Sequence, residues 1–271
     1  MSLTKPPGPL SAQPTPEINY TLDGPKHRIL FEPHPRRIRA EIGGVTALDT
    51  VRGRLLHESN IVPVLYAPVE DFDETLLERT EHVTHCPFKG EASYWSVRVG
   101  DHVAENAIWA YEDPIEKAAW LRGYASMYWS KAEAWFEEDE RVFGHLRDPY
   151  HRVDIRASSR SARVLAGDEV VAESAHPVLL FETNMPVRAY FRRDDVRGEL
   201  IPSDKQTICP YKGTARYWSL RVDGETIPDA VWSYEDPLEG ARGITGLVSF
   251  LAPGVDLELE GAGVIAGVAF R

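Results

Sequence analysis

The sequence contains only two cysteines, Cys86 and Cys209, in 271 residues. A disulfide framework needs more, so we expect two free thiols and a reducing, cytoplasmic location. No apolar stretch approaches the roughly 20 residues that a transmembrane helix requires. The first 29 residues are rich in proline and lack the hydrophobic segment of a secretory signal. We therefore expect a soluble chain without membrane association.

Positive charge is also scarce: the chain has 30 lysines and arginines but 42 aspartates and glutamates, which gives a net charge of -12. Nucleic-acid binding needs clustered basic residues, so no nucleic-acid partner is predicted. The chain has no C-x-x-C pair and no glycine-rich phosphate loop. The segment "HVTHC" before Pro87 resembles a metal cluster, but the matching segment before Pro210 reads "KQTIC". We therefore predict no metal and no cofactor.

The sequence does contain a long internal repeat. The phrase "CPFKGEASYWSVRV" begins at Cys86, and "CPYKGTARYWSLRV" begins at Cys209. A shift of 123 residues aligns the two phrases, and 16 of the 29 positions from Cys86 to Pro114 are identical. Further upstream a shift of 124 matches Arg39/Arg163, Gly43/Gly167, Glu58/Glu182 and Asn60/Asn184. The chain is therefore predicted to hold a tandem duplication.

The repeat predicts three segments. Residues 1–29 form a flexible, proline-rich arm, residues 30–150 form the first repeat domain, and residues 151–265 form the second. The turn-rich stretch "HLRDPYHRVDIRASSR" marks the junction between the two domains.

Each unit is predicted to consist mainly of antiparallel strands. "SARVLAGD" followed by "EVVAES" reads as a hairpin, and "ASYWSVRVGD" alternates before a glycine turn. In this second strand Trp95, Val97 and Val99 share one face, predicted to be core. Tyr94 and Arg98 share the opposite, amphipathic face, which could line a cleft.

A helix is predicted after the motif W-x-Y-E-D-P in each unit. Asp113 and Asp236 would be helix N-caps, with Pro114 and Pro237 at the first helical position. Helical spacing continues through "PIEKAAWLRGYASMYW". The acidic run "SKAEAWFEEDERVF" that follows is predicted to be a solvated helix and linker found in the first unit alone.

The phrase "C-P-[FY]-K-G-x-A-x-Y-W-S" followed by "W-x-Y-E-D-P" resembles the family catalogued as domain of unknown function 427, sometimes labelled nucleotidyltransferase-like. The resemblance covers roughly residues 36–150 and 156–260. It implies two tandem β-tent domains, a mainly β (α+β) fold similar to the drug-binding domain of cereblon and to methionine-R-sulfoxide reductases. It implies no established activity. Relatives of that fold commonly bind zinc through paired C-x-x-C motifs, which this chain lacks.

Candidate catalytic residues fall within or near the repeated phrase. They are Lys89, Lys212, Glu112, Glu235, Cys86 and Cys209. A lysine between an aromatic residue and glycine can bind an anion or, when desolvated, act as a base or nucleophile. Its alternative roles are a surface side chain stacked on a tyrosine or tryptophan, and an ion pair with the glutamate of the Y-E-D-P motif. That glutamate is either an acid–base group or the ion-pair partner of Arg98 or Arg221.

The thiols have a weaker functional case. A nearby lysine can lower the pKa of a cysteine and make it a nucleophile. Free cysteine is often simply buried, however, and no histidine occupies matching positions in the two units to serve as a base. We therefore favour a structural role for both thiols. Glu58 and Asn60, with Glu182 and Asn184, are interpreted as turn residues at the end of a strand.

The tyrosines of the motifs are candidates for lining a cleft, because a buried hydroxyl requires a hydrogen-bond partner. The candidate ligand-binding residues are Tyr94, Arg98, Tyr111, Tyr217, Arg221 and Tyr234. We expect each unit to bind or transform a small molecule, with anions among the candidates, in a pocket built from these residues. A non-catalytic interaction module and a thiol-dependent redox enzyme stay open as alternatives. The sequence does not indicate the substrate, the reaction or the oligomeric state.

Overall fold

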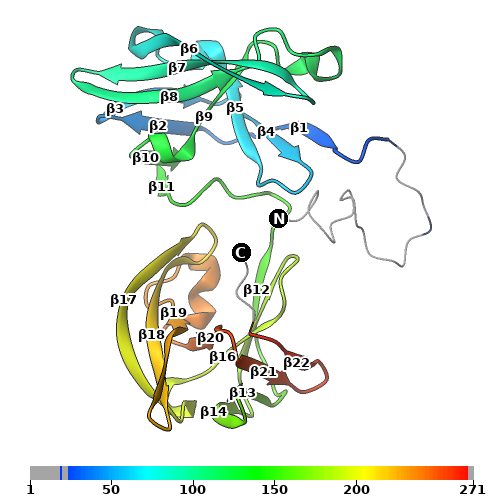
Figure 1. The fold of residues 1–271 in the computed structure, drawn as a ribbon, viewed down its shortest axis with the longest axis vertical. Coiled ribbons are helices and arrows are strands. Elements are labelled where there is room, and N and C mark those ends of the chain that lie inside the picture. Colours follow the sequence, from blue (N-terminus) through cyan, green and yellow to red (C-terminus); the bar gives the residue numbers. More distant parts are fainter. Residues whose placement is uncertain (1–18, 20–23, 268–271) are drawn as a thin grey trace. The chain divides into compact units, whose positions relative to one another are not determined.

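The computed structural model of the chain describes residue 19 and residues 24–267. The chain divides into two compact units, Met1–Asp148 and Pro149–Arg271, each of which is built from antiparallel strands (Figure 1). The fold is thus mainly β and duplicated, as predicted. The predicted arm, residues 1–29, lies largely outside the described residues. In the part of the chain that the structure describes, no helix is long and apolar enough to span a membrane.

The first unit is built around a seven-stranded antiparallel sheet in the order β1-β4-β5-β9-β8-β7-β6. Its strands are β1 (Ile29–Pro33), β4 (Arg54–Glu58), β5 (Val64–Pro68), β6 (Leu77–Cys86), β7 (Gly90–Val99), β8 (His102–Ala110) and β9 (Tyr124–Met127). The repeated phrase supplies the turn between β6 and β7 and then β7 itself. Opposite Ser96 of β7, strand β8 has a bulge, where the backbone N–H of Asn106 donates a hydrogen bond of 3.0 Å to Ser96 Oγ.

A four-stranded sheet, in the order β11-β10-β2-β3, completes the first unit. Its strands are β2 (Ile38–Ile42), β3 (Val45–Thr50), β10 (Ala134–Glu137) and β11 (Glu140–Val142). Ile38 and Ile42 of β2 and Trp135 of β10 share one buried cluster with Val97 of β7 and Ile108 of β8. The two sheets therefore enclose a common core, and Figure 1 shows β2 and β10 facing β7 and β8.

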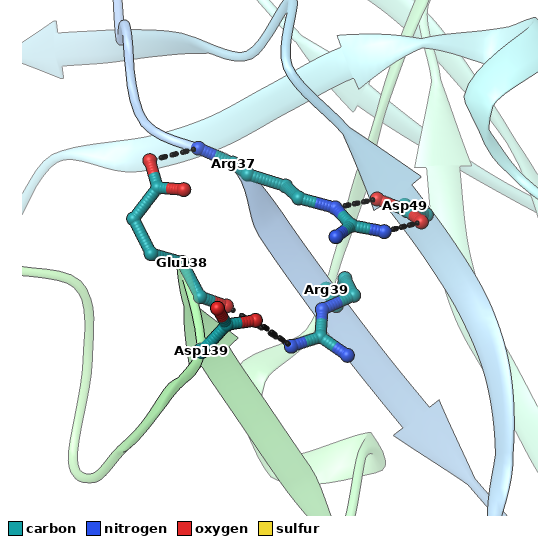
Figure 2. A network of polar contacts seen from close by, with 5 residues as sticks. All are labelled: Arg37, Arg39, Asp49, Glu138 and Asp139. Atoms are coloured by element: carbon teal, nitrogen blue, oxygen red, sulfur yellow. Dashed lines mark hydrogen bonds and ion pairs between the residues drawn. The ribbon is translucent and has the colours of Figure 1, made fainter.

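The prediction of a solvated helix in the acidic run after Trp129 is wrong. The run forms β10 and β11, because Trp135 is buried in the core while neighbouring carboxylates face outward. Figure 2 shows how Arg37, which precedes β2, and Arg39 of β2 bind this acidic turn. Arg39 donates hydrogen bonds to the Glu138 carbonyl and to Asp139, and the backbone N–H of Arg37 donates to the Glu138 carboxylate at 3.0 Å. Arg37 also binds Asp49 of β3.

The second unit repeats these strands in three sheets, with the orders β12-β15-β16, β14-β13-β21-β22 and β17-β18-β19-β20. The strands are β12 (Val153–Ala157), β13 (Ala162–Ala166), β14 (Glu169–Ser174), β15 (Val178–Glu182), β16 (Arg188–Tyr190), β17 (Glu199–Cys209), β18 (Gly213–Val222), β19 (Glu225–Ser233), β20 (Val248–Phe250), β21 (Val255–Leu259) and β22 (Gly263–Ile265). Since β21 and β22 pair as β10 and β11 do, the segment predicted for the first unit alone exists in both.

Both faces of the large sheet in the first unit contribute to buried clusters. Trp95, Val97 and Val99 join the cluster between the sheets, as predicted. Tyr94 points to the other face, where it is 4% exposed in a second cluster with Tyr66, Tyr111 and other residues. The face predicted to be amphipathic is therefore interior at Tyr94 and exposed at Arg98.

Each unit has one helix after the Y-E-D-P motif, but it is a short 3-10 helix. These are η3 (Glu116–Leu121) and η6 (Glu239–Ile244). The predicted capping by Asp113 is wrong, because η3 follows Ile115 without a side-chain cap and Asp113 instead accepts a hydrogen bond from Arg122. The apolar spacing that predicted a longer helix continues into β9. Other short 3-10 turns are η1 (Val69–Asp71), η2 (Glu74–Leu76), η4 (Trp129–Lys131) and η5 (Arg193–Asp195).

Candidate functional site

A carboxylate occupies the same place in both units, buried in the first and largely buried in the second. In the first unit, Glu58 at the end of β4 forms an ion pair with Lys89 and a hydrogen bond of 3.0 Å with the Nε2 of His27. Glu58 is 6% exposed and Lys89 is 7% exposed. In the second unit, Glu182 at the end of β15 binds Lys212 at 2.5 Å and His151 at 3.0 Å. We call each set of three residues the His–Glu–Lys cluster.

The turn of the repeated phrase places the lysine of each cluster. The N–H of Lys89 donates to the Cys86 carbonyl at 3.2 Å, and the Lys89 carbonyl accepts from the N–H of Ile115 at 3.0 Å. Gly90 follows at φ +107°, a region of backbone conformation open mainly to glycine. A Cβ there would lie 3.3 Å from the Ile115 nitrogen, so glycine also permits the close approach of the segment before η3. The phrase K-G thus encodes the geometry of the turn.

The histidines of the two clusters were missed in the sequence, and the expectation that no histidine occupies matching positions is wrong. The shift of 124 residues continues upstream of Arg39 and aligns His27-Arg28 with His151-Arg152. Each histidine also contacts the aromatic residue that precedes the lysine. His27 stacks on Phe88 with ring centroids 3.9 Å apart, and His151 lies 4.3 Å from Tyr211. Extending the repeat to the arm would have revealed the pair.

The charge of Glu182 is compensated within its own cluster. Burial raises the pKa of Glu182, but its hydrogen bonds with His151 and Lys212 and their charges outweigh burial and lower the pKa to about 2. Burial raises the pKa of Tyr234 in the same unit, and likewise that of Tyr111 in the first. The Glu182 carboxylate is therefore ionised at neutral pH, and its own neighbours compensate its charge. Chemically, each cluster ties the segment before the first strand of its unit to the turn of the repeated phrase.

The two thiols lie beside these clusters. Cys86 and Cys209 are free and half-buried. Burial is the main cause of the raised pKa of Tyr111, and the neighbouring Cys86 adds to it. Among the described residues no group of three or more histidine, cysteine, aspartate or glutamate side chains is arranged to hold a metal ion.

The glutamate of the Y-E-D-P motif pairs with neither of its predicted partners. Glu112 binds Arg79 of β6 through two hydrogen bonds of 3.0 and 2.6 Å, and the Arg79 guanidinium lies 5.2 Å from the Trp95 ring centroid. The expected pairs with Lys89 and Arg98 are wrong, because Lys89 is held by Glu58 and Arg98 binds Glu78 of β6.

The second unit forms the equivalent contacts with an arginine from another element. Glu235 binds Arg193 of η5 at 2.7 Å, and the Arg193 guanidinium lies 4.4 Å from the Trp218 ring centroid. Arg221, like Arg98, forms its ion pair elsewhere, with Glu199 at 2.9 Å.

The candidate tyrosines of β7 and β18 have local partners. The Tyr94 hydroxyl is 2.9 Å from the Thr84 hydroxyl, and the Tyr217 hydroxyl is 3.0 Å from that of Thr207. Both hydrogen bonds connect neighbouring strands of one sheet, β6 to β7 and β17 to β18.

An open cavity of about 900 Å³ lies in the first unit, between the large sheet and the segment that carries η1 and η2. Tyr111 and Glu112 are the candidate site residues that line it. The complete lining is Val69, Glu70, Phe72, Asp73, Glu74, Thr75, Leu77, Trp95, Ile108, Ala110, Tyr111, Glu112, Gly123, Tyr124 and Ala125. Apolar side chains of the sheet form its floor, and four carboxylates belong to its rim. No lysine, arginine or histidine is among these lining residues.

The fold and the paired clusters define a duplicated antiparallel β protein whose two copies share one framework. Residues 30–138 and 154–261 both match the family described as Domain of unknown function (DUF427). The chain belongs to this family and carries two tandem copies of its domain, as the repeated phrase predicted. A search of curated proteins finds no match to the chain.

Proposed function

We propose that the first unit binds a small organic cation with an apolar or aromatic body in the cavity bounded by η1, η2 and β9. The observation that carries the proposal is the lining of that cavity, which combines an apolar floor with a rim of carboxylates. The cavity volume of about 900 Å³ lies within the range of small-molecule sites, roughly 300–1,000 Å³.

The charge of the rim favours a cation over the anion considered from the sequence. Glu70 is paired with Arg52 at 2.7 Å, and Glu112 is paired with Arg79. Glu74 is exposed and forms no ion pair with another described residue, while Asp73 accepts hydrogen bonds from Thr75 without being neutralised. The rim therefore keeps a negative charge. It attracts a ligand ammonium or guanidinium and repels a carboxylate or phosphate.

The floor of the cavity supports an apolar ligand body. Trp95, Tyr111 and Tyr124 contribute aromatic surface, and Leu77 and Ile108 contribute aliphatic surface. Burial of apolar ligand area is worth about 25 cal/mol per Å², which is the largest favourable term available to a small molecule here. An aromatic ring beside a cation adds about 0.5–1 kcal/mol at an exposed site and about 2 kcal/mol at a desolvated one.

The proposal is tested by thermal shift and calorimetry on the full chain with three probes of one size. Phenethylamine carries the cation, phenethyl alcohol is its neutral counterpart, and phenylacetate is an anionic counterpart. A ligand that binds the native state alone raises the unfolding temperature in proportion to its saturation. We expect phenethylamine to stabilise most and phenylacetate least. Equal responses to the three probes, or the strongest response to phenylacetate, would contradict the proposal.

A matched pair of variants locates the effect. Glu74→Gln removes a rim charge without removing an ion pair, and we expect it to weaken phenethylamine binding several-fold, equivalent to about 1 kcal/mol for one solvent-exposed charge. Glu116→Gln changes an exposed glutamate that is not part of the lining, and binding should be unchanged. If both variants bind like the wild-type chain, the ligand is not held at this rim.

A further inference from the structure

We propose that the second unit has its own arginine, Arg193, in the place that the ligand occupies in the first unit, so that the chain has one functional site of this kind. This inference rests on the proposed function of the first unit and adds a residue that decides which repeat binds.

Equivalent backbone pairings show which residues of the two repeats correspond in this region. Phe72 forms a β-bridge with Leu48 in the first unit, and Val196 forms one with Ala172 in the second. Both pairs are related by the shift of 124 residues. The same shift superimposes η1 on η5 and places Arg193 at the position of Val69.

The contacts of Arg193 cross the region that is open in the first unit. Its guanidinium binds Glu235 at 2.7 Å and lies 4.4 Å from the Trp218 ring centroid. The counterparts of Arg193, Glu235 and Trp218 are Val69, Glu112 and Trp95, and all three line the cavity of the first unit. A side chain that joins these three positions must span the corresponding space in the second unit.

The first unit satisfies its glutamate and tryptophan without closing the cavity. Arg79 reaches Glu112 and Trp95 from β6, where it is the cross-strand partner of Trp95. At the equivalent register of the second unit, Pro202 is the partner of Trp218 and has no charged group to offer. Both units thus place a guanidinium against the tryptophan and the glutamate. In the first unit it comes from the neighbouring strand, and in the second unit it comes across the space that corresponds to the cavity.

The rim of the second unit also differs in charge. Asp73 corresponds to Arg197 under the same shift, and Arg197 forms an ion pair with Glu173 of β14. A basic residue therefore replaces an acidic one close to the position of Arg193. Both replacements disfavour a cationic ligand in the second unit, because Arg193 occupies space and the change from Asp73 to Arg197 removes a carboxylate that would attract the cation.

Reciprocal variants of the full chain test the inference, with phenethylamine as the probe and isothermal titration calorimetry as the measurement. We expect one site per wild-type chain. Val69→Arg gives the first unit the residue of the second, and we expect it to reduce affinity at least about tenfold through steric exclusion and added positive charge. Val69→Thr introduces a residue about as large as valine at this exposed position, and this variant should bind phenethylamine like the wild-type chain. Circular dichroism and the unfolding temperature verify that each variant is folded.

The opposite exchange should create a second site. The double variant Arg193→Val/Arg197→Asp gives the second unit the residues found at positions 69 and 73, and we expect its stoichiometry to rise from one to two. Two sites in the wild-type chain, undiminished affinity in Val69→Arg, or one site in the double variant would each overturn the inference while the proposed function stands. A wild-type chain that does not bind phenethylamine would overturn both.

Discussion

Lys89 and Glu58 show how a single residue pair holds distant parts of a unit together. Their side chains are 31 residues apart in sequence, yet the ion pair is almost inaccessible to solvent. The gain from such a pair over apolar packing is small, but the loss of one partner is costly because the other charge stays buried. The same reasoning applies to Lys212 and Glu182.

Lys89→Met is therefore expected to lower the free energy of unfolding by about 3–5 kcal/mol, because it leaves the Glu58 carboxylate buried without its lysine. Urea denaturation monitored by fluorescence measures the change. The control is Arg98→Ala, which breaks an ion pair on the surface and should have a much smaller effect. Equal losses of unfolding free energy in the two variants would show that the buried ion pair stabilises the fold no more than the surface pair does.

Acid should weaken the cluster of the second unit. The pKa of Glu182 is lowered to about 2 from an ordinary value of 4.5, so this carboxylate stabilises the folded state at any pH above 4.5. The contribution is lost as the pH falls from 4.5 towards 2, and its full size is on the order of 3 kcal/mol. We expect the difference in unfolding free energy between the wild-type chain and Glu182→Gln to shrink as the pH is lowered from 6 to 3. A difference that is constant over this range would contradict the assignment.

At the scale of elements, the turn between β6 and β7 is the feature that the repeated phrase specifies. Gly90 has a positive φ and lies against the backbone that precedes η3, as Gly213 does before η6. The turn and the following strand were predictable because both depend on residues close in sequence. The long helix was not, since apolar spacing alone does not distinguish a helix from a 3-10 turn followed by a buried strand.

Gly90→Ala is expected to destabilise the chain by about 1–3 kcal/mol, because a residue with a Cβ is strained at φ +107° and would crowd the Ile115 nitrogen. Gly100→Ala is the matched control. Gly100 also has a positive φ, of +57°, but a Cβ there would meet no atom within 4 Å. Chemical denaturation compares the two variants, and a loss in Gly100→Ala equal to that in Gly90→Ala would show that contact with the segment before η3 contributes nothing.

The candidate site was only partly predictable, for a physical reason that concerns η1 and η2. Tyr111 and Glu112 were found because they belong to a motif present in both units. The cavity beside them is bounded by Val69, Asp73 and Glu74, where the two repeats differ. A comparison that looks for identity between repeats passes over such positions. The partners of Lys89 and Glu112 were likewise hidden, because they depend on which strands pair.

At the scale of the whole molecule, each unit has its own interior. The buried clusters of the first unit contain residues 38–146, and those of the second contain residues 162–259. The duplication has therefore preserved two cores while the segments around η1 and η5 have diverged.

Separate cores predict separate responses to damage. We expect Lys89→Met to accelerate amide hydrogen exchange in β4 and in the β6–β7 turn, while peptides of the second unit exchange at the wild-type rate. Lys212→Met should show the reverse pattern. Exchange mass spectrometry measures both, and faster exchange throughout the chain in either variant would show that the two cores are coupled.

The most direct test of the account is a nuclear magnetic resonance titration of the 15N-labelled chain with phenethylamine, observing the indole N–H signals of its seven tryptophans. Trp95→Phe and Trp218→Phe assign the two signals that matter. The account predicts that the Trp95 signal shifts progressively to saturation while the Trp218 signal keeps its position, because Arg193 covers that ring. An unchanged Trp95 signal, or equal shifts at Trp95 and Trp218, would contradict it.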